Sequence, residues 1–196
     1  AFASAPVSSQ ENPTLLGLRQ FRDHAVVEVR ECGLQPAVVM TMLEHVRRKV
    51  NSLGLAAWQG SGAGYLRFLV VHTPLHASQG PPQLLVECIT GGNHRQVLPT
   101  GKADGRNGLS NADKVRELGT ELMKEFSLTG FVHSERKTSS DVAQGERCIF
   151  KAGSNNYEEC FGHITLRVPY NTFLQTNTAI AGLLYARVAE EAGLTG

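Results

Sequence analysis

Three consecutive basic residues, Arg47, Arg48 and Lys49, form the first group in this 196-residue chain that could bind a charged partner. Cationic side chains can contact nucleic-acid phosphates without reading the base sequence. The run also lies near the end of a predicted helix, where the helix dipole favours cations by about 0.3–1 kcal/mol. Two interpretations therefore stay open, an RNA contact and a solvated helix face, and the residue types alone favour the solvated face.

Another cation and a segment near the C-terminus could also do chemistry. Arg67 lies among apolar residues of a predicted strand, where a guanidinium usually pairs with a carboxylate or reaches a sheet edge. Contact with RNA or with another domain is the alternative for Arg67. Phe173 and Gln175 lie directly before a predicted helix. From their residue types alone, Phe173 could anchor the core and Gln175 could cap that helix.

The sequence carries no signature of a self-contained enzyme. It has no GxSxG, HExxH or P-loop motif. Its four cysteines form no CxxC pair, and neither they nor the seven histidines have zinc-finger spacing. We therefore predict no metal site in this chain.

Composition narrows the class of protein further. Hydrophobic residues make up 41% and charged residues 19%, the balance of an ordinary globular domain, and the net charge of +1 argues against a uniformly basic nucleic-acid binder. No apolar run reaches the about 18 residues that span a bilayer, so we predict no membrane partner. Scattered cysteines indicate an intracellular protein with reduced thiols. Because the chain starts at Ala1, we expect a trimmed piece, either cytoplasmic or, if a targeting segment was removed, organellar.

The elements that must position these residues alternate irregularly along the chain. The small and polar residues 1–14 predict a flexible leader, and the Gly-rich stretches 59–64 and 91–108 predict a loop and a mobile excursion. An α+β fold follows, with a mainly antiparallel sheet and helices packed on one face. Hydrophobic periodicity predicts helices over 36–53, 110–126 and from 177 onward, and strands over 25–31, 65–72, 83–90, 130–134, 147–151 and 158–168.

Several short motifs resemble those of the RNA 5-methyluridine (uracil-C5) methyltransferases, and they occur in the same order as in that family. Each motif is weak alone, but the ordered set, over about residues 15–196, is fairly specific. The motifs are Val27-Glu28-Val29-Arg30-Glu31-Cys32-Gly33-Leu34, Gly64-Tyr65-Leu66-Arg67-Phe68-Leu69-Val70-Val71, the turn Gly145-Glu146-Arg147, Phe161-Gly162, and Phe173-Leu174-Gln175-Thr176-Asn177.

The resemblance implies roles for particular residues. Gln175 would contact S-adenosylmethionine, because an amide can both donate and accept at the amino-acid end of the cofactor. Phe173 would line the same pocket or stack near an extruded base. The nucleophilic cysteine and general base of the family would lie outside this chain, so we predict no catalytic residue within it. Cys32 lies where some members place the last ligand of an iron–sulfur cluster, but a buried thiol is expected here. The candidate RNA contacts are Phe173, Arg67, Arg47, Arg48 and Lys49.

The resemblance also implies a division of the chain. Residues 15–170 would be a central domain that positions RNA, and residues 171–196 would begin a Rossmann-like methyltransferase domain. We therefore expect part of an S-adenosylmethionine-dependent tRNA or rRNA uracil-C5 methyltransferase, inactive alone, with a C-terminal helix exposed enough to form a dimer. The alternatives are a non-catalytic RNA-binding or assembly module of the same fold and an unrelated α+β interaction domain.

Overall fold

The computed structural model describes residues 2–4, 13–23, 25–59, 64–74, 83–92, 108–162 and 164–193. Most of the predicted loop 59–64 and excursion 91–108 lies outside these residues. The described elements are, in chain order, β1 (Phe2–Ser4), β2 (Thr14–Leu16), β3 (Leu18–Arg19), β4 (Val26–Val27), α1 (Ala37–Ser52), β5 (Leu66–His72), β6 (Leu85–Thr90), α2 (Asn111–Glu125), β7 (Gly130–Glu135), β8 (Arg147–Gly153), β9 (Asn156–Phe161), β10 (Ile164–Pro169) and α3 (Thr178–Glu191).

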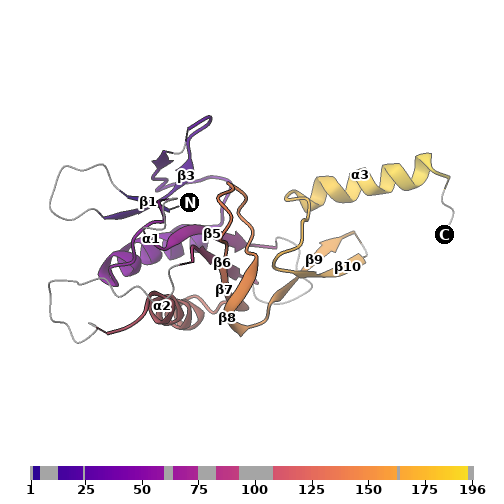
Figure 1. The fold of residues 1–196 in the computed structure, drawn as a ribbon. Coiled ribbons are helices and arrows are strands. Elements are labelled where there is room, and N and C mark those ends of the chain that lie inside the picture. The colour runs from indigo at the N-terminus through magenta and orange to yellow at the C-terminus, as the bar shows by residue number, and fades with distance from the viewer. Residues whose placement is uncertain are drawn as a thin grey trace.

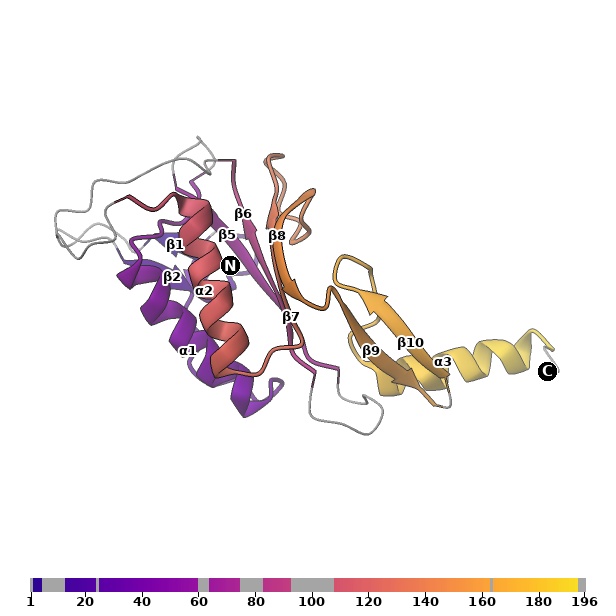
Figure 2. The same ribbon diagram turned by 90° about the horizontal axis from the view of Figure 1, so that it is seen from below.

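A four-stranded sheet in the order β5-β6-β7-β8 forms the centre of the molecule. The pairs β5/β6 and β7/β8 are antiparallel, whereas β6 and β7 run parallel because the chain crosses over through α2 between them. Both α1 and α2 cover the same face of this sheet, as Figure 2 shows. The predicted α+β class, with a mainly antiparallel sheet and helices on one face, is confirmed.

The main core fills the space between these helices and the sheet. Buried residues recur at the three- and four-residue spacing that gives a helix one apolar face: Val39, Met42 and Val46 on α1 and Val115, Leu118 and Leu122 on α2. Gly119 lets α2 approach the sheet closely, since a Cβ there would lie 2.4 Å from the ring of Phe131. The sequence periodicity therefore identified the faces on which α1 and α2 pack.

Polar side chains join α1 to α2 at the edge of this core. Lys49 Nζ lies 2.9 Å from Glu117 Oε1 and also pairs with Glu121, whose other oxygen is 2.7 Å from His45 Nε2. Burial alone lowers the pKa of Lys49, but the hydrogen bonds with Glu121 and Glu117 raise it above its ordinary value. The hydrogen bond from Lys49 lowers the pKa of Glu121.

The lowered pKa of Glu121 predicts a pH-dependent contribution to stability. The charged carboxylate stabilises the native state above the ordinary glutamate pKa of about 4.3, and this contribution is lost as the pH falls through the lower folded-state pKa. We expect Glu121→Gln to cost about 0.5–1 kcal/mol at pH 7 and to flatten the acid side of the stability profile. Urea unfolding between pH 3 and 7, with the exposed Glu125→Gln as control, measures this; equal profiles for the two variants would contradict it.

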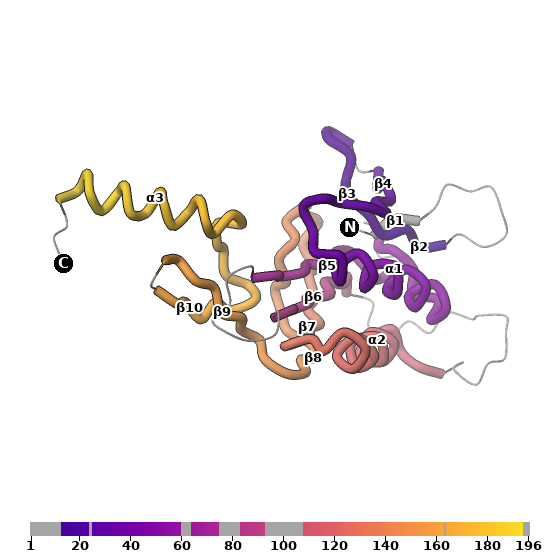
Figure 3. Tube along the Cα trace, turned by 180° about the vertical axis from the view of Figure 1, so that it is seen from behind, coloured from indigo at the N-terminus to yellow at the C-terminus, as the bar shows by residue number. Residues whose placement is uncertain are grey.

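The C-terminal part of the chain packs on the opposite face of the sheet at Leu85. β9 and β10 form a hairpin, and Tyr157 and Val168 of this hairpin pack on Leu85 of the central sheet together with Tyr170 and Leu174. α3 contacts β9 and extends away from the rest of the molecule, as Figures 1 and 3 show from opposite sides. The segment that precedes α3 is therefore anchored on the central sheet.

Three predicted elements differ in the structure. The strand predicted over 158–168 is the β9–β10 hairpin, because Gly162 turns the chain with a positive φ of 61°. The strand predicted over 25–31 is reduced to β4, which pairs with β3 in a two-stranded sheet. The predicted flexible leader, residues 1–14, contains β1, which pairs antiparallel with β2 at the end of the leader.

α3 exposes much of its apolar surface. Its N-terminal turn buries Thr178 and Ala181, whereas the large apolar side chains are half exposed or more. None of the described helices is both long and apolar enough to cross a membrane. The dimer expected through this helix stays a prediction. The exposed apolar residues of α3 are Ile180, Leu183, Leu184, Tyr185 and Val188.

Candidate functional site

Arg47 lies inside the fold, although its position in the basic run predicted an RNA contact as one alternative. Only 7% of the residue is exposed. Its guanidinium donates to the carbonyl of Leu16 at 3.2 Å and to the carbonyl of Val29, and it lies 3.2 Å from Glu44 and 3.4 Å from Glu28. Arg47 therefore ties α1 to two N-terminal segments, a structural role that leaves its donors turned away from solvent.

The other two members of the run have different surroundings. Arg48 is exposed on α1, whereas Lys49 is held by Glu117 and Glu121 of α2. Three adjacent residues on a helix point in three directions, about 100° apart, so they cannot act as one basic patch. Of the three, Arg48 has the geometry to meet a phosphate.

Arg67 also has a structural environment, in which its partners are main-chain oxygens in place of the carboxylate that was one of the two expected alternatives. It is 4% exposed and donates to the carbonyls of Arg136 and Thr138 at 2.8 Å and of Ser140 at 2.7 Å. Its guanidinium stacks 4.0 Å from the ring centre of Trp58. Burial, together with the nearby charges of Arg136 and Arg19, lowers the pKa of Arg67.

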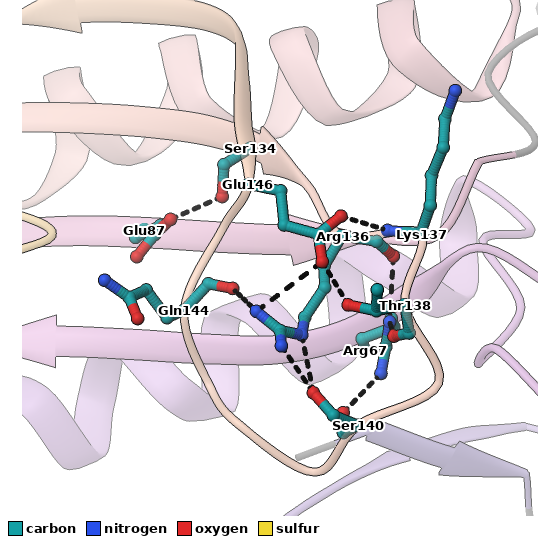
Figure 4. A network of polar contacts seen from close by, with 9 residues as sticks. All are labelled: Arg67, Glu87, Ser134, Arg136, Lys137, Thr138, Ser140, Gln144 and Glu146. Carbon is teal, nitrogen blue, oxygen red and sulfur yellow. Dashed lines mark hydrogen bonds and ion pairs between the residues drawn. The ribbon is translucent and has the colours of Figure 1, made fainter.

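The carbonyls that Arg67 binds belong to the β7–β8 connection, residues 136–146, called the braced loop below. Arg136 donates to Ser140 Oγ at 3.0 Å and to the carbonyl of Gln144 at 2.8 Å (Figure 4). Glu146 accepts from the Lys137 main-chain N–H at 3.0 Å and from the hydroxyl of Thr138. These contacts, which join the two ends of the loop, hold it in one conformation over the sheet.

The base of the braced loop lies close to a buried carboxylate. Glu87, 2% exposed, accepts a hydrogen bond from the Ser134 hydroxyl, and burial raises the pKa of Glu87. Gly145 passes directly above this pair, since a Cβ there would lie 2.1 Å from Ser134 Oγ. Glycine at position 145 therefore lets the loop lie flat on the sheet.

The braced loop touches the segment that carries the candidate cofactor residue. Gln144 Nε2 donates to the carbonyl of Asn171 at 3.0 Å. Leu174 turns inward onto the Leu85 cluster, whereas Phe173 is 84% exposed and Gln175 is also exposed. Phe173 and Gln175, on either side of the inward Leu174 in sequence, therefore expose a ring and an amide to solvent.

The interpretation of Phe173 and Gln175 as parts of the fold is wrong in this structure. Phe173 is too exposed to anchor a core. The side chain that caps α3 is Asn177, whose Oδ1 accepts from the Ile180 N–H at 3.1 Å. Phe173 and Gln175 are thus available to a ligand, and their chemistry suits stacking and hydrogen bonding.

Cys32 is half-buried rather than buried, and it lines an apolar cavity of about 300 Å³ with Leu34, Met40 and Leu43. The residues that line this cavity include neither Phe173 nor Gln175. In the part of the chain that the structure describes, no three His, Cys, Asp or Glu side chains gather as a metal site.

Sequence reasoning missed Gln144 and Arg136, the residues that connect the sheet to the 171–175 segment. The only signal nearby was the Gly145-Glu146-Arg147 turn, which suggested a reversal of the chain but no contact with residues 170–175. Contacts between a loop and a segment about 30 positions later depend on the packing of β9 and β10, which local patterns do not encode.

Known proteins similar to this chain are RNA methyltransferases, although no family model matches it. An uncharacterised RNA methyltransferase of Nitratidesulfovibrio vulgaris is 36% identical over 183 residues, which are 92% of this chain and 35% of that protein. Another, from Halalkalibacterium halodurans, is 22% identical over 99% of this chain and 38% of its own length. The chain thus spans about a third of the length of these relatives.

The fold is shared with a solved structure. The tRNA (uracil-54, C5)-methyltransferase of Pyrococcus abyssi, determined with S-adenosyl-L-homocysteine, superposes with a TM-score of 0.62 at 17% identity. The match covers 88% of this chain and 37% of the archaeal one. At this identity the likeness shows a common fold.

Proposed function

We propose that this chain, a relative of RNA methyltransferases over nearly its whole length, is part of an S-adenosylmethionine-dependent RNA uracil-C5 methyltransferase. In this proposal residues 15–170 position the RNA, a tRNA or rRNA, and residues 171–196 begin the methyltransferase domain. Gln175 forms one wall of the cofactor site. The nucleophile and the general base belong to the part of the protein outside this chain.

The observation that carries the proposal is the 36% identity to an RNA methyltransferase across 92% of the chain. Two further observations support the finer assignment. The ordered motifs resemble the uracil-C5 family, and the fold is that of an enzyme whose structure contains S-adenosyl-L-homocysteine. The outward position of Phe173 and Gln175, which take no part in capping or core packing, fits residues kept for a ligand.

Methyl transfer by the full-length protein tests this proposal. The protein is incubated with S-adenosylmethionine carrying a labelled methyl group and with unmodified tRNA and rRNA, and the nucleosides are then identified by mass spectrometry. We expect label in 5-methyluridine with the full-length protein and none with this chain alone. Label in a different nucleoside would refute the uracil-C5 assignment. Salt-sensitive RNA binding without any transfer by the full-length protein would favour the non-catalytic RNA-binding module.

A further inference from the structure

We infer that Arg67 and Gln144 are positioning residues that, through the braced loop, fix the segment 171–175 on the central sheet. The inference about position stands on contacts within this chain. Its consequence for the cofactor rests on the proposed function, because it assumes that Gln175 binds S-adenosylmethionine. Neither residue is expected to touch the cofactor.

The first step is the binding of main-chain carbonyls of the loop by Arg67. One guanidinium from β5 satisfies the carbonyls of Arg136, Thr138 and Ser140, and Trp58 covers its face. Because Arg67 is almost fully buried, water competes little for these carbonyls. Loss of the guanidinium would leave three carbonyls without their donor and release the first half of the loop.

The second step is the link, through Arg136, between the part of the loop that Arg67 binds and Gln144 near its end. Arg136 binds Ser140 Oγ and the carbonyl of Gln144, so the position of Gln144 depends on the conformation that Arg67 sets. The Gln144 amide then donates to the carbonyl of Asn171. In Figure 4 the Arg67 and Arg136 guanidinium groups both point into the loop, from opposite sides of Ser140.

The third step concerns the segment that receives this contact. At its start, the main-chain bonds between described residues are Tyr170 N–H to Asn155 and Thr172 N–H to Pro169, and both partners belong to the C-terminal region. Leu174 holds the inner side of the segment against the Leu85 cluster. Gln144 therefore adds a polar contact from the braced loop to Asn171, two residues before Phe173 and four before Gln175.

Residue-resolved hydrogen exchange by NMR on this chain tests the positioning. Gln144→Ala and the isosteric Gln144→Glu both remove the donor to Asn171, and we expect each to speed exchange of the Tyr170 and Thr172 amides by about 3–10-fold. Arg67→Ala should have the same effect and also speed exchange of the Lys137 and Glu146 amides. The exposed Arg48→Ala serves as the matched control and should leave all four amides unchanged.

Two results would overturn the inference. One is unchanged exchange of Tyr170 and Thr172 in both Gln144 variants, which are conservative enough to fold even if Arg67→Ala does not. The other is a change in Gln144→Ala alone, because that would indicate lost side-chain volume in place of a lost hydrogen bond.

Calorimetry with S-adenosylhomocysteine on the full-length protein separates this inference from the proposed function. We expect Gln144→Glu to weaken binding of S-adenosylhomocysteine by about 3–10-fold, the same factor as the expected increase in the exchange rates. Faster exchange together with unchanged affinity would leave the positioning role intact and refute the assignment of Gln175 to the cofactor site.

Discussion

Replacing Arg47 by alanine is expected to lower the free energy of unfolding by about 2–4 kcal/mol, whereas replacing its neighbour Arg48 changes it by less than about 0.5 kcal/mol. The Arg47 variant leaves the carbonyl of Leu16 and the carboxylate of Glu28 without a buried donor. Both substitutions occur on the same helix and replace the same residue type, so the change in helix propensity cancels between them. Urea unfolding monitored by circular dichroism measures the difference.

Arg47→Lys is the informative intermediate. An ammonium keeps the positive charge but cannot present the planar guanidinium that reaches the Leu16 and Val29 carbonyls and Glu44 together. We expect its unfolding midpoint to lie between those of the wild type and Arg47→Ala. Equal midpoints for Arg47→Ala and Arg48→Ala would contradict the structural role and return Arg47 to the candidate RNA contacts.

The contrast between Arg47 and Arg48 shows what local sequence can and cannot predict. Periodicity identified the helix and its apolar face, because Met42 and Val46 recur at helical spacing within a few residues of each other. The partners of Arg47 lie about 30 and 18 positions earlier in the chain, at Leu16 and Val29. Their proximity follows from the tertiary packing of β2 and the segment around residue 29 on α1, which the sequence spacing does not contain.

The same distinction applies near the C-terminus. Gly162-His163 between two apolar residues is a short-range hairpin signal, so local sequence is enough to divide the strand predicted over 158–168 into two. Asn177 is likewise a preferred capping residue by local rules. The braced loop is different, because its conformation depends on Arg67, about 70 residues earlier and on another strand.

If Gln175 binds the cofactor as proposed, Gln175→Ala in the full-length protein is expected to weaken binding of S-adenosylhomocysteine by about 10–100-fold, the loss of one to two hydrogen bonds. Gln175 is exposed in this chain and does not cap α3, so the substitution should leave the unfolding midpoint of the chain unchanged. Calorimetry measures the affinity, and urea unfolding of the same preparation measures the stability. RNA binding, followed by a salt-titrated shift assay, should be unaffected.

Thr176→Ala is the matched control for Gln175→Ala, because Thr176 is the adjacent exposed residue and the family motif leaves its identity open. Both Gln175 and Thr176 are exposed, and only Gln175→Ala removes the amide. A cofactor bound through that amide should therefore respond to Gln175→Ala and not to Thr176→Ala. Equal affinities of the Gln175→Ala and Thr176→Ala variants for S-adenosylhomocysteine would mean that the exposed amide of Gln175 does not bind the cofactor. If Gln175→Ala also abolished RNA binding, the partner of the amide would be the RNA.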